Sequence, residues 1–526
     1  MLGEQKRKGI VEELLKDKLV VKHGFDPIDI SHGINWEYAH GHNEKTYAVY
    51  LHALEYVGYL ALEGKESGEE RYFDKALQII NSWIQINCGK YIEHSWNEHA
   101  VSYRLNNLIL FQESAPNSYK IQNEKFDSLI KMHCEYLADE KNYKPNNHGI
   151  LMDESLFNAS FYIKDKILNE LYRNLALSRV KLALYRDFSR KGLHSENSPE
   201  YHRMMVIVFS RLNELLKEKS FSLTNDLNHK IKKAKTLLRV LLKPDNTYPL
   251  VGDTSFRVED NLKKDFNDFV DYEAGIAVFQ NENTSDKVKS DYLYFKCGYL
   301  SKTHKHYDDL SVSLMLDGND IFIDSGKYNY NKEDPIRSYV VSPEAHTVPI
   351  IEGKTYHPSS PIVDQYNLGI SQARIENNYK VIRGYNTLYE GCILVRTIVL
   401  TIEGIVFVYD EIHSEEEENL IQNFNINENA KITIAKDNYV EIEVNENKYI
   451  MTAVQNNEPK IEEITGYYSQ HFSQYKKNTH IRYINQTGVH NSLIVVHDSE
   501  KKLENINWNK DTLTYQYNGK EFEIYL

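Results

Sequence analysis

The chain has 526 residues, of which 41% are hydrophobic and 26% charged, a composition typical of folded globular proteins and long enough for at least two domains. Its formal net charge of -14 argues against a nucleic-acid-binding function, because phosphate recognition relies on clustered Lys and Arg. The four cysteines are far apart and form no CxxC pair, so neither a disulfide framework nor a thiolate zinc site is indicated.

The N-terminal segment does not have the pattern of a signal peptide. Acidic residues at Glu4, Glu12 and Glu13 interrupt it, and no apolar segment of the required length follows. No uninterrupted apolar stretch of about 18 residues occurs, so we expect no membrane-spanning helix and no membrane partner. As given, the chain is predicted to be cytoplasmic; it would be periplasmic or secreted if an export signal had been removed.

Up to about residue 245, apolar residues recur with the spacing of amphipathic helices. The predicted helices cover residues 46–62, 72–86, 103–114, 125–140, 168–188 and 201–219. Many amphipathic helices joined by short connections predict a helical array.

From about residue 290 the apolar pattern changes to the alternation of β-strands, with turns at DG, EG and NEN. The strand-rich segments are 291–300, 310–324, 392–412, 431–454 and 491–500. This pattern predicts an antiparallel β-domain of sandwich type. The Pro-, Gly- and Asn-rich stretch 242–256 either separates the two regions or lines a cleft, and we assign a helical domain to 1–265 and a β-domain to 266–526.

The stretch 303–326 begins with two histidines one residue apart. On a strand, His304 and His306 would point to one face and share a site. The chain then turns and returns to Asp324, and a His-plus-carboxylate set suits Zn²⁺. Asp324 reaches the face of His306 only if the turn has three residues or a bulge. The alternative is that both histidines only form hydrogen bonds across a sheet face.

Two further segments place polar side chains at predicted helix starts. Asn147 and His148 follow a turn, where an Asn side chain either caps the helix or helps to offset the charge of a bound carboxylate. Tyr201 lies in the first turn of a helix that starts at Ser198 and Pro199, where the helix dipole should lower the pKa of the phenol. The spacing of Tyr201 from apolar residues also fits an ordinary core tyrosine.

Taken together, these residues resemble the heparinase II/III family of polysaccharide lyases. The family's C-terminal signature is roughly H-x-H-x-D, a glycine turn between strands, D-x-G-x-Y-x-Y, R-x-Y, and a His before a strand. It is matched in order by His304, His306, Asp308, Gly318, Asp324, Gly326, Tyr328, Tyr330, Arg337, Tyr339 and His346. In the helical half, the resemblance includes the NNHG motif at 146–149, Tyr201, and the helix 96–108 with its His and Arg. One departure is Thr347, where members commonly have Asn.

The resemblance implies an N-terminal incomplete (α/α) toroid followed by an antiparallel β-sandwich. It also implies cleavage beside a uronic acid by β-elimination, which leaves a 4,5-unsaturated product. In such a reaction Asn147 with His148 would offset the substrate carboxylate, His304 would remove the C5 proton, and Tyr201 would protonate the leaving oxygen. For one C5 epimer Tyr201 could also act as the base, so the division between Tyr201 and His304 stays open.

The resemblance further implies a structural metal, for which we expect Zn²⁺, held by His306, Asp324 and His346. Its other expected sites are substrate-binding positions on both sides of the groove. The candidates are His99, Arg104, Arg203, Arg337 and Tyr339.

The expected partner is an acidic polysaccharide, such as heparan, heparosan, another glycosaminoglycan or a bacterial exopolysaccharide. One alternative is a non-catalytic protein that binds uronate polymers or assists exopolysaccharide assembly. Another is a glycoside hydrolase on a helical toroid, which would need two catalytic carboxylates. Asp153, Glu154 and Glu200 are available for that role, but nothing in their spacing selects them.

Overall fold

The protein is described by a computed structural model that covers residues 4–22, 25–38, 44–90, 94–434, 439–454, 459–509 and 511–526. The chain forms two compact units: unit 1 consists of Met1–Arg186 and Val208–Thr224, and unit 2 of Asp187–Ile207 and Asn225–Leu526. Within the described ranges, no helix is both long and apolar enough to span a membrane.

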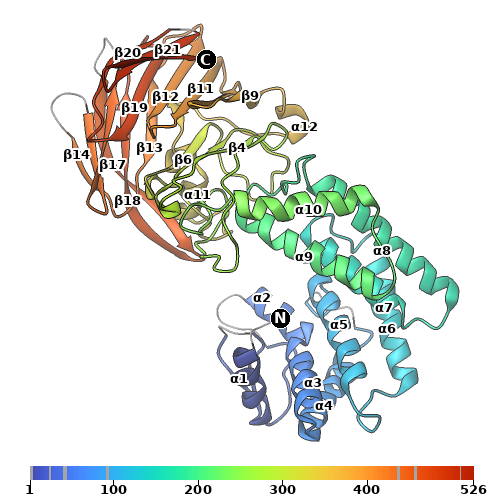
Figure 1. Cartoon of the computed structure of the whole chain (residues 1–526). Helices are drawn as coiled ribbons and strands as arrows, with labels where there is room; N and C mark the ends of the chain where they lie inside the picture. The colour runs from blue at the N-terminus through green and yellow to red at the C-terminus, as the bar shows by residue number, and fades with distance from the viewer. Residues whose placement is uncertain are drawn as a thin grey trace. The chain divides into compact units, whose positions relative to one another are not determined.

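The first 240 residues are mainly helical and are drawn from blue to green in Figure 1. The helices are α1 (Glu4–Leu15), α2 (Glu44–Ala53), α3 (Glu55–Ser67), α4 (Glu70–Asn87), α5 (Glu98–Ser114), α6 (Asn123–Ala138), α7 (Asn147–Ser160), α8 (Lys166–Asp187), α9 (Pro199–Glu218) and α10 (Asn225–Val240). A two-stranded sheet of β1 (Lys18–Leu19) and β2 (Ile28–Asp29) follows α1.

The helical periodicity of the sequence corresponds to buried stripes in unit 1. On α4, Phe73, Ile80 and Trp83 are almost completely buried, and α3 packs against both α4 and α5. Burial of each such side chain contributes about 1.5–3 kcal/mol. The prediction of one helix over residues 46–62 was wrong. The backbone adopts a left-handed conformation at Leu54 (φ 53°), which separates α2 from α3.

The C-terminal part is built from antiparallel strands. They are β3 (Phe269–Asp271), β4 (Ile276–Asn281), β5 (Asp291–Lys296), β6 (Ser311–Leu316), β7 (Asn319–Phe322), β8 (Pro349–Ile351), β9 (Leu368–Ile375), β10 (Tyr379–Asn386), β11 (Cys392–Thr401), β12 (Val406–Ser414), β13 (Leu420–Asn425), β14 (Lys431–Ile434), β15 (Tyr439–Val444), β16 (Asn447–Ala453), β17 (Lys460–His471), β18 (Gln474–Ile484), β19 (Asn491–Asp498), β20 (Leu503–Trp508), β21 (Thr512–Tyr517) and β22 (Lys520–Tyr525). Two short helices, α11 (Pro335–Val341) and α12 (Pro361–Asp364), lie between β7 and β9. Residues 435–438 of the predicted segment 431–454 lie outside the described residues.

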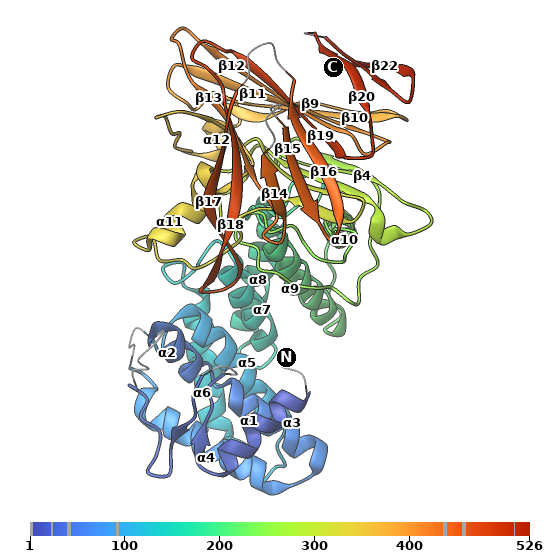
Figure 2. The same cartoon turned by 90° about the vertical axis from the view of Figure 1, so that its left-hand side faces the viewer.

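These strands form four sheets, and neighbouring strands within each run side by side in Figure 2. Their strand orders are β3-β4-β5-β6-β7, β14-β15-β16-β19-β12-β11-β10-β9, β17-β18-β13-β8 and β20-β21-β22. One hydrophobic core joins the first three sheets, with Phe295, Val408 and Phe424 as one representative from each. The three-stranded sheet packs on the eight-stranded sheet through contacts such as Phe407 with Tyr515.

The other face of the five-stranded sheet is covered by the end of α10. Leu237 and Val240 belong to the same buried cluster as Tyr292 and Met315. The change from helices to strands therefore lies between Val240 and Phe269, an interval that includes the predicted boundary at residue 265. The compact units divide the chain differently, because α10 and the first residues of α9 pack with the sheets.

Candidate active site

The two histidines of the HxH motif lie in a turn and not on a strand, contrary to the prediction. β6 begins only at Ser311, and His304 has a left-handed backbone (φ 57°), which is uncommon for a residue with a side chain. The two histidines nevertheless meet at one carboxylate. His304 Nδ1 lies 2.6 Å from Asp253 Oδ2, and His306 Nε2 lies 3.0 Å from Asp253 Oδ1.

Asp253 is the central residue of this site, and the sequence analysis did not identify it. It is fully buried in the loop after α10, within the stretch 242–256. Gly252 has φ 56°, and a Cβ there would lie 2.4 Å from the carbonyl oxygen of Asn197, so the close approach of this loop requires glycine. Burial raises the pKa of the Asp253 carboxyl, but hydrogen bonds from the two histidines and an arginine outweigh it and hold the pKa far below its usual range.

The arginine that binds Asp253 is Arg337. Its Nη1 lies 2.5 Å from Oδ1 and its Nη2 lies 3.2 Å from Oδ2, while Nη1 also donates to the carbonyl oxygen of Lys327. Arg337 was predicted to bind substrate, but its guanidinium is occupied by these contacts. Of the other candidates in unit 2, Arg203 pairs with Glu259 at 2.6 Å, and the partly buried Tyr339 hydroxyl lies 3.5 Å from His480 Nε2.

Tyr201 lies beside His304. The two rings stack with centroids 3.7 Å apart, and the Tyr201 hydroxyl lies 2.6 Å from that of Tyr330. The Ser198 side chain accepts a hydrogen bond from the Tyr201 backbone N–H at 3.4 Å, as expected for a helix cap. Burial raises the pKa of Tyr201 to about 12, although the Tyr330 hydrogen bond lowers it. The expected lowering of the pKa by the helix dipole was wrong, because desolvation of the phenolate is the larger effect.

The three proposed metal ligands lie near one another. His346 Nδ1 is hydrogen-bonded to Asp324 Oδ1, and the rings of His306 and His346 have centroids 5.4 Å apart. The hairpin of β6 and β7 contains the required bulge, between the pairs Leu314↔Phe322 and Met315↔Asp320. Among the described residues, no group of three or more His, Cys, Asp or Glu side chains is already arranged to hold a metal ion.

Two buried nitrogen atoms at this place are compatible with a metal. His306 Nδ1 and His346 Nε2 are fully buried and have no hydrogen-bond partner within the described part of the chain. Neutral imidazole nitrogens are good Zn²⁺ ligands, and a carboxylate often holds the opposite ring nitrogen. The residues therefore fit a metal, with Asp324 placed to orient His346 or to become a ligand after a small rearrangement.

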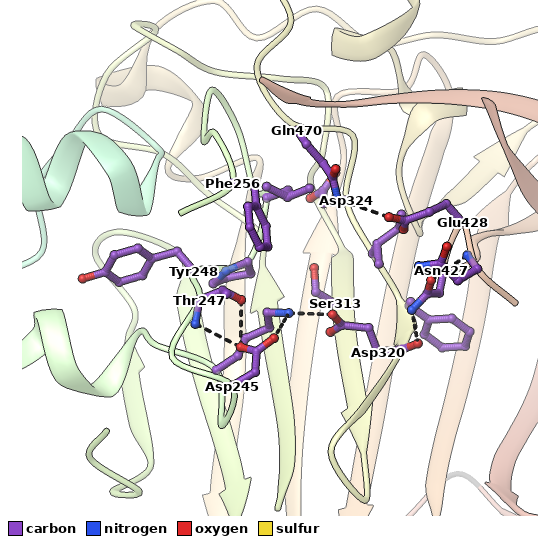
Figure 3. Close-up of a pocket in the computed structure, with 16 residues that line it drawn as sticks. Asp245, Thr247, Tyr248, Phe256, Ser313, Asp320, Asp324, Asn427, Glu428 and Gln470 are labelled. Carbon is purple, nitrogen blue, oxygen red and sulfur yellow. Dashed lines mark hydrogen bonds and ion pairs between the residues drawn. The ribbon is translucent and has the colours of Figure 1, made fainter. Parts of the chain in front are cut away.

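A pocket of about 230 Å³ adjoins Asp324 in unit 2 (Figure 3). Its lining includes Phe256, Ser313 and Glu428, and its buried Lys243 forms ion pairs with Asp245 at 3.2 Å and Asp320 at 2.6 Å. Among the described residues, Lys243 is the one basic residue in this lining, which also contains the acidic residues Asp245, Asp320, Asp324 and Glu428. Tyr201 and His304 do not line it.

In unit 1, Asn147 and His148 occupy the start of α7. Asn146 is the capping residue, and its side chain accepts a hydrogen bond from the His148 backbone N–H. His148 Nδ1 lies 2.9 Å from Glu98 Oε1. The backbone contact confirms the predicted capping by an Asn of this motif, and Asn147 is the first residue of the helix.

His99 lies next to this pair, with its ring centroid 5.3 Å from that of His148 and stacked on Tyr103. Burial lowers the pKa of His99 to about 4, so its ring is neutral at physiological pH. Unit 1 thus presents a polar, partly buried cluster that includes Asn147, His148, His99 and the acceptor Glu98.

Arg104 was predicted to bind substrate, and the structure contradicts this. Its side chain is fully buried, with the guanidinium 4.1 Å from the Trp83 ring. It donates to His133 Nε2 at 2.9 Å and to the carbonyl oxygens of His52 and Ser95. A polysaccharide cannot reach this position, so Arg104 has a structural role in unit 1.

Comparison with known proteins agrees with this architecture. The family model described as the heparinase II/III N-terminus matches residues 2–280, and the heparinase II/III-like C-terminal model matches residues 261–509. A curated "heparin-sulfate lyase" from Bacteroides thetaiotaomicron is 23% identical over 255 residues; the match covers 45% of this chain and only 36% of that protein.

Solved structures give the same fold over the whole chain. The heparan sulfate lyase HepC from Pedobacter heparinus has a TM-score of 0.79 at 16% identity, with coverage of 100% of this chain and 90% of its own. A structure of heparinase III has a TM-score of 0.82 at 16% identity and covers 100% and 91%. The predicted fold, a helical (α/α) toroid followed by an antiparallel β-sandwich, is confirmed. With both family models matched along its length, the chain belongs to the heparinase II/III family.

Proposed function

We propose that the protein is a polysaccharide lyase that cleaves a uronic-acid-containing glycosaminoglycan by β-elimination. The observation that carries this proposal is the contact between Tyr201 and His304, in which a phenol and an imidazole are stacked and each is held by a further partner. Family membership and the names of the relatives, a heparin-sulfate lyase and a heparan sulfate lyase, support the same chemistry.

The two side chains fit the two proton transfers of the reaction. An imidazole is a suitable base for the C5 proton, since its ordinary pKa is close to neutral pH. Loss of that proton forms the C4–C5 double bond and breaks the bond from C4 to the leaving oxygen. Tyr201, with its pKa raised to about 12, remains protonated at working pH and can supply the proton that this oxygen needs. We therefore assign His304 as the base and Tyr201 as the acid.

A third requirement is to offset the negative charge of the substrate carboxylate, which increases as the C5 proton is removed. We assign this task to Asn147 and His148 at the start of α7: the amide can donate hydrogen bonds, and His148, whose Nδ1 faces the Glu98 carboxylate, would donate from Nε2 as the imidazolium. The contact of His148 Nδ1 with Glu98 Oε1 holds the imidazole in place and leaves its other nitrogen for the ligand. The partly buried position of these groups strengthens such hydrogen bonds.

We also propose a structural divalent metal, Zn²⁺ in the first instance, bound by His306, Asp324 and His346. Bound there, it would fix the two imidazoles and satisfy their buried nitrogen atoms. Metal analysis of the purified protein tests this, together with the thermal midpoint before and after treatment with a chelator. We expect about one metal per chain, and its loss in His346→Ala. A metal-free protein whose midpoint is insensitive to both chelator and added Zn²⁺ would contradict the site.

The lyase activity itself is tested with a panel of uronate polysaccharides, by the ultraviolet absorbance of the unsaturated product. We expect Tyr201→Phe and His304→Ala to abolish product formation, while the exposed Tyr366→Phe serves as a control with full activity. A polysaccharide-binding protein without activity would bind the polymer but give no product. A glycoside hydrolase would shorten the polymer without creating the absorbance.

A further inference from the structure

We propose that Asp253 is a positioning residue that sets the tautomers of two histidines at once. It gives His304 its basic nitrogen at Nε2 and leaves His306 with its unprotonated nitrogen at Nδ1. The role of His304 in this inference rests on the proposed lyase function, whereas the assignment of the two tautomers does not.

The argument begins with the charge of the carboxylate. Asp253 is buried but receives hydrogen bonds from His304, His306 and Arg337, and these donors hold it in the ionised form. An ionised carboxylate can only accept hydrogen bonds. The ring nitrogens that face it, Nδ1 of His304 and Nε2 of His306, must therefore both carry hydrogen. In each neutral ring the opposite nitrogen then has a free lone pair.

For His304 this places the lone pair on Nε2. Glu196 Oε2 lies 3.6 Å from that nitrogen, which is beyond hydrogen-bond distance. The His304 side chain is 14% exposed, so the side chain is largely shielded from solvent but is not fully buried. When Nε2 takes a proton, the imidazolium gains stabilisation from Asp253 on one side and from Glu196 on the other. A buried carboxylate orients the histidine of the Ser-His-Asp triad in the same way.

For His306 the same carboxylate places the lone pair on the other ring nitrogen, Nδ1. This ring is fully buried, and its Nδ1 has no partner within the described ranges. A buried lone pair of this kind costs free energy unless a ligand satisfies it. Asp253 therefore links the proposed base to the proposed metal ligand through a single side chain, and its two oxygen atoms serve one histidine each.

The orientation of the carboxylate is fixed by Arg337. The guanidinium contacts both oxygens of Asp253, at 2.5 Å and 3.2 Å, and is itself tied to the carbonyl oxygen of Lys327. Such a two-point contact restrains rotation of the carboxylate. Gly252, with its left-handed backbone, allows the loop to bring Asp253 against the turn that carries His304.

The direct test is the side-chain ¹⁵N spectrum of the full-length protein with labelled histidine. His304→Gln and His306→Gln identify the two sets of signals. We expect His304 to carry hydrogen on Nδ1 and not on Nε2, and His306 to show the reverse. In Asp253→Asn one of the two patterns should be reversed, since the amide oxygen still accepts from one ring nitrogen while the amide nitrogen donates to the other. A purely structural role for Asp253 predicts no such change.

The kinetic test uses the same variant. We expect Asp253→Asn to lower kcat by about 10²- to 10⁴-fold, as for the neutralised aspartate of a catalytic triad, with KM changed less than about threefold. Asp364→Asn is the matched control, because Asp364 is also buried and hydrogen-bonded, to Ser359 and Ser360, but lies outside the proposed site. It should lower the thermal midpoint and leave kcat unchanged.

The outcomes separate this inference from the proposed function. A wild-type spectrum with His304 protonated on Nε2, or full kcat in Asp253→Asn, overturns the role of Asp253. If the wild type cleaves none of the polysaccharides, the lyase proposal fails, and the spectra alone then decide whether Asp253 sets the two tautomers. If Asp253→Asn does not fold, the wild-type spectrum still confirms or overturns the assignment.

Discussion

The hydroxyl of Tyr330 provides a quantitative test of how Tyr201 is used. Tyr330→Phe removes only the oxygen that lies 2.6 Å from the Tyr201 hydroxyl and keeps the ring that contacts His304. When Tyr201 gives up its proton, the acceptor changes from a phenol to a phenolate. A hydrogen bond to a charged group contributes about 1 kcal/mol more than one to a neutral group. Only this difference lowers the barrier, so kcat should fall about fivefold with KM unchanged.

The assay is steady-state formation of the unsaturated product by the wild type and the Tyr330→Phe, Tyr201→Phe and Tyr366→Phe variants. Loss of the acid itself in Tyr201→Phe should cost at least about 10²-fold, so the first two variants must differ clearly. Tyr366→Phe should match the wild type. If Tyr330→Phe were as inactive as Tyr201→Phe, or if Tyr201→Phe kept most of its activity, the assignment of Tyr201 as the acid would be refuted.

Two further predictions concern stability. Arg104→Ala should lower the free energy of unfolding by roughly 3–5 kcal/mol, since three hydrogen bonds and the contacts with Trp83 and Trp96 are lost; a loss below about 1 kcal/mol in urea titrations would contradict this. Burial lowers the pKa of Lys264 from 10.5 to about 7. Between these values the unfolded chain binds a proton that the folded chain does not, so stability should rise with pH, by about 2 kcal/mol from pH 7 to 9. Lys264→Met should abolish this rise, and an unchanged pH profile would refute the shift.

The fold was predictable from the sequence because its signals are local. Amphipathic spacing indicated the helices, and alternation around short turns indicated the strands. The predictions failed at positions where the apolar pattern of the sequence continues although the backbone conformation changes. The apolar spacing of residues 46–62 is unbroken, so nothing in it reveals the left-handed backbone at Leu54. Likewise, His304 was assigned to a strand because period-two alternation precedes β6 by a few residues.

The misassignment of Arg104 had a detectable signal. On α5, Arg104 lies within a stripe formed by Val101, Leu105 and Leu108, all of which are buried. A charged residue inside an apolar stripe is expected to be buried and paired and not to face a groove. The resemblance to the family led to the prediction that Arg104 binds substrate. The helical period of the apolar residues around it instead predicts a side chain in the core.

Asp253 could not have been found in this way, because its partners are distant in sequence. His304 is 51 residues away, His306 is 53 and Arg337 is 84, and each belongs to a different local pattern from the loop of Asp253. Sequence spacing gave two histidines with separate tasks but no reason why both should be neutral with defined lone pairs. That reason is chemical: one ionised carboxylate that faces two imidazoles dictates the hydrogen positions on both. The HxH spacing brings two rings within hydrogen-bond distance of different oxygens of the same carboxylate. The left-handed backbone at His304 is part of this arrangement, and a regular strand would not provide it.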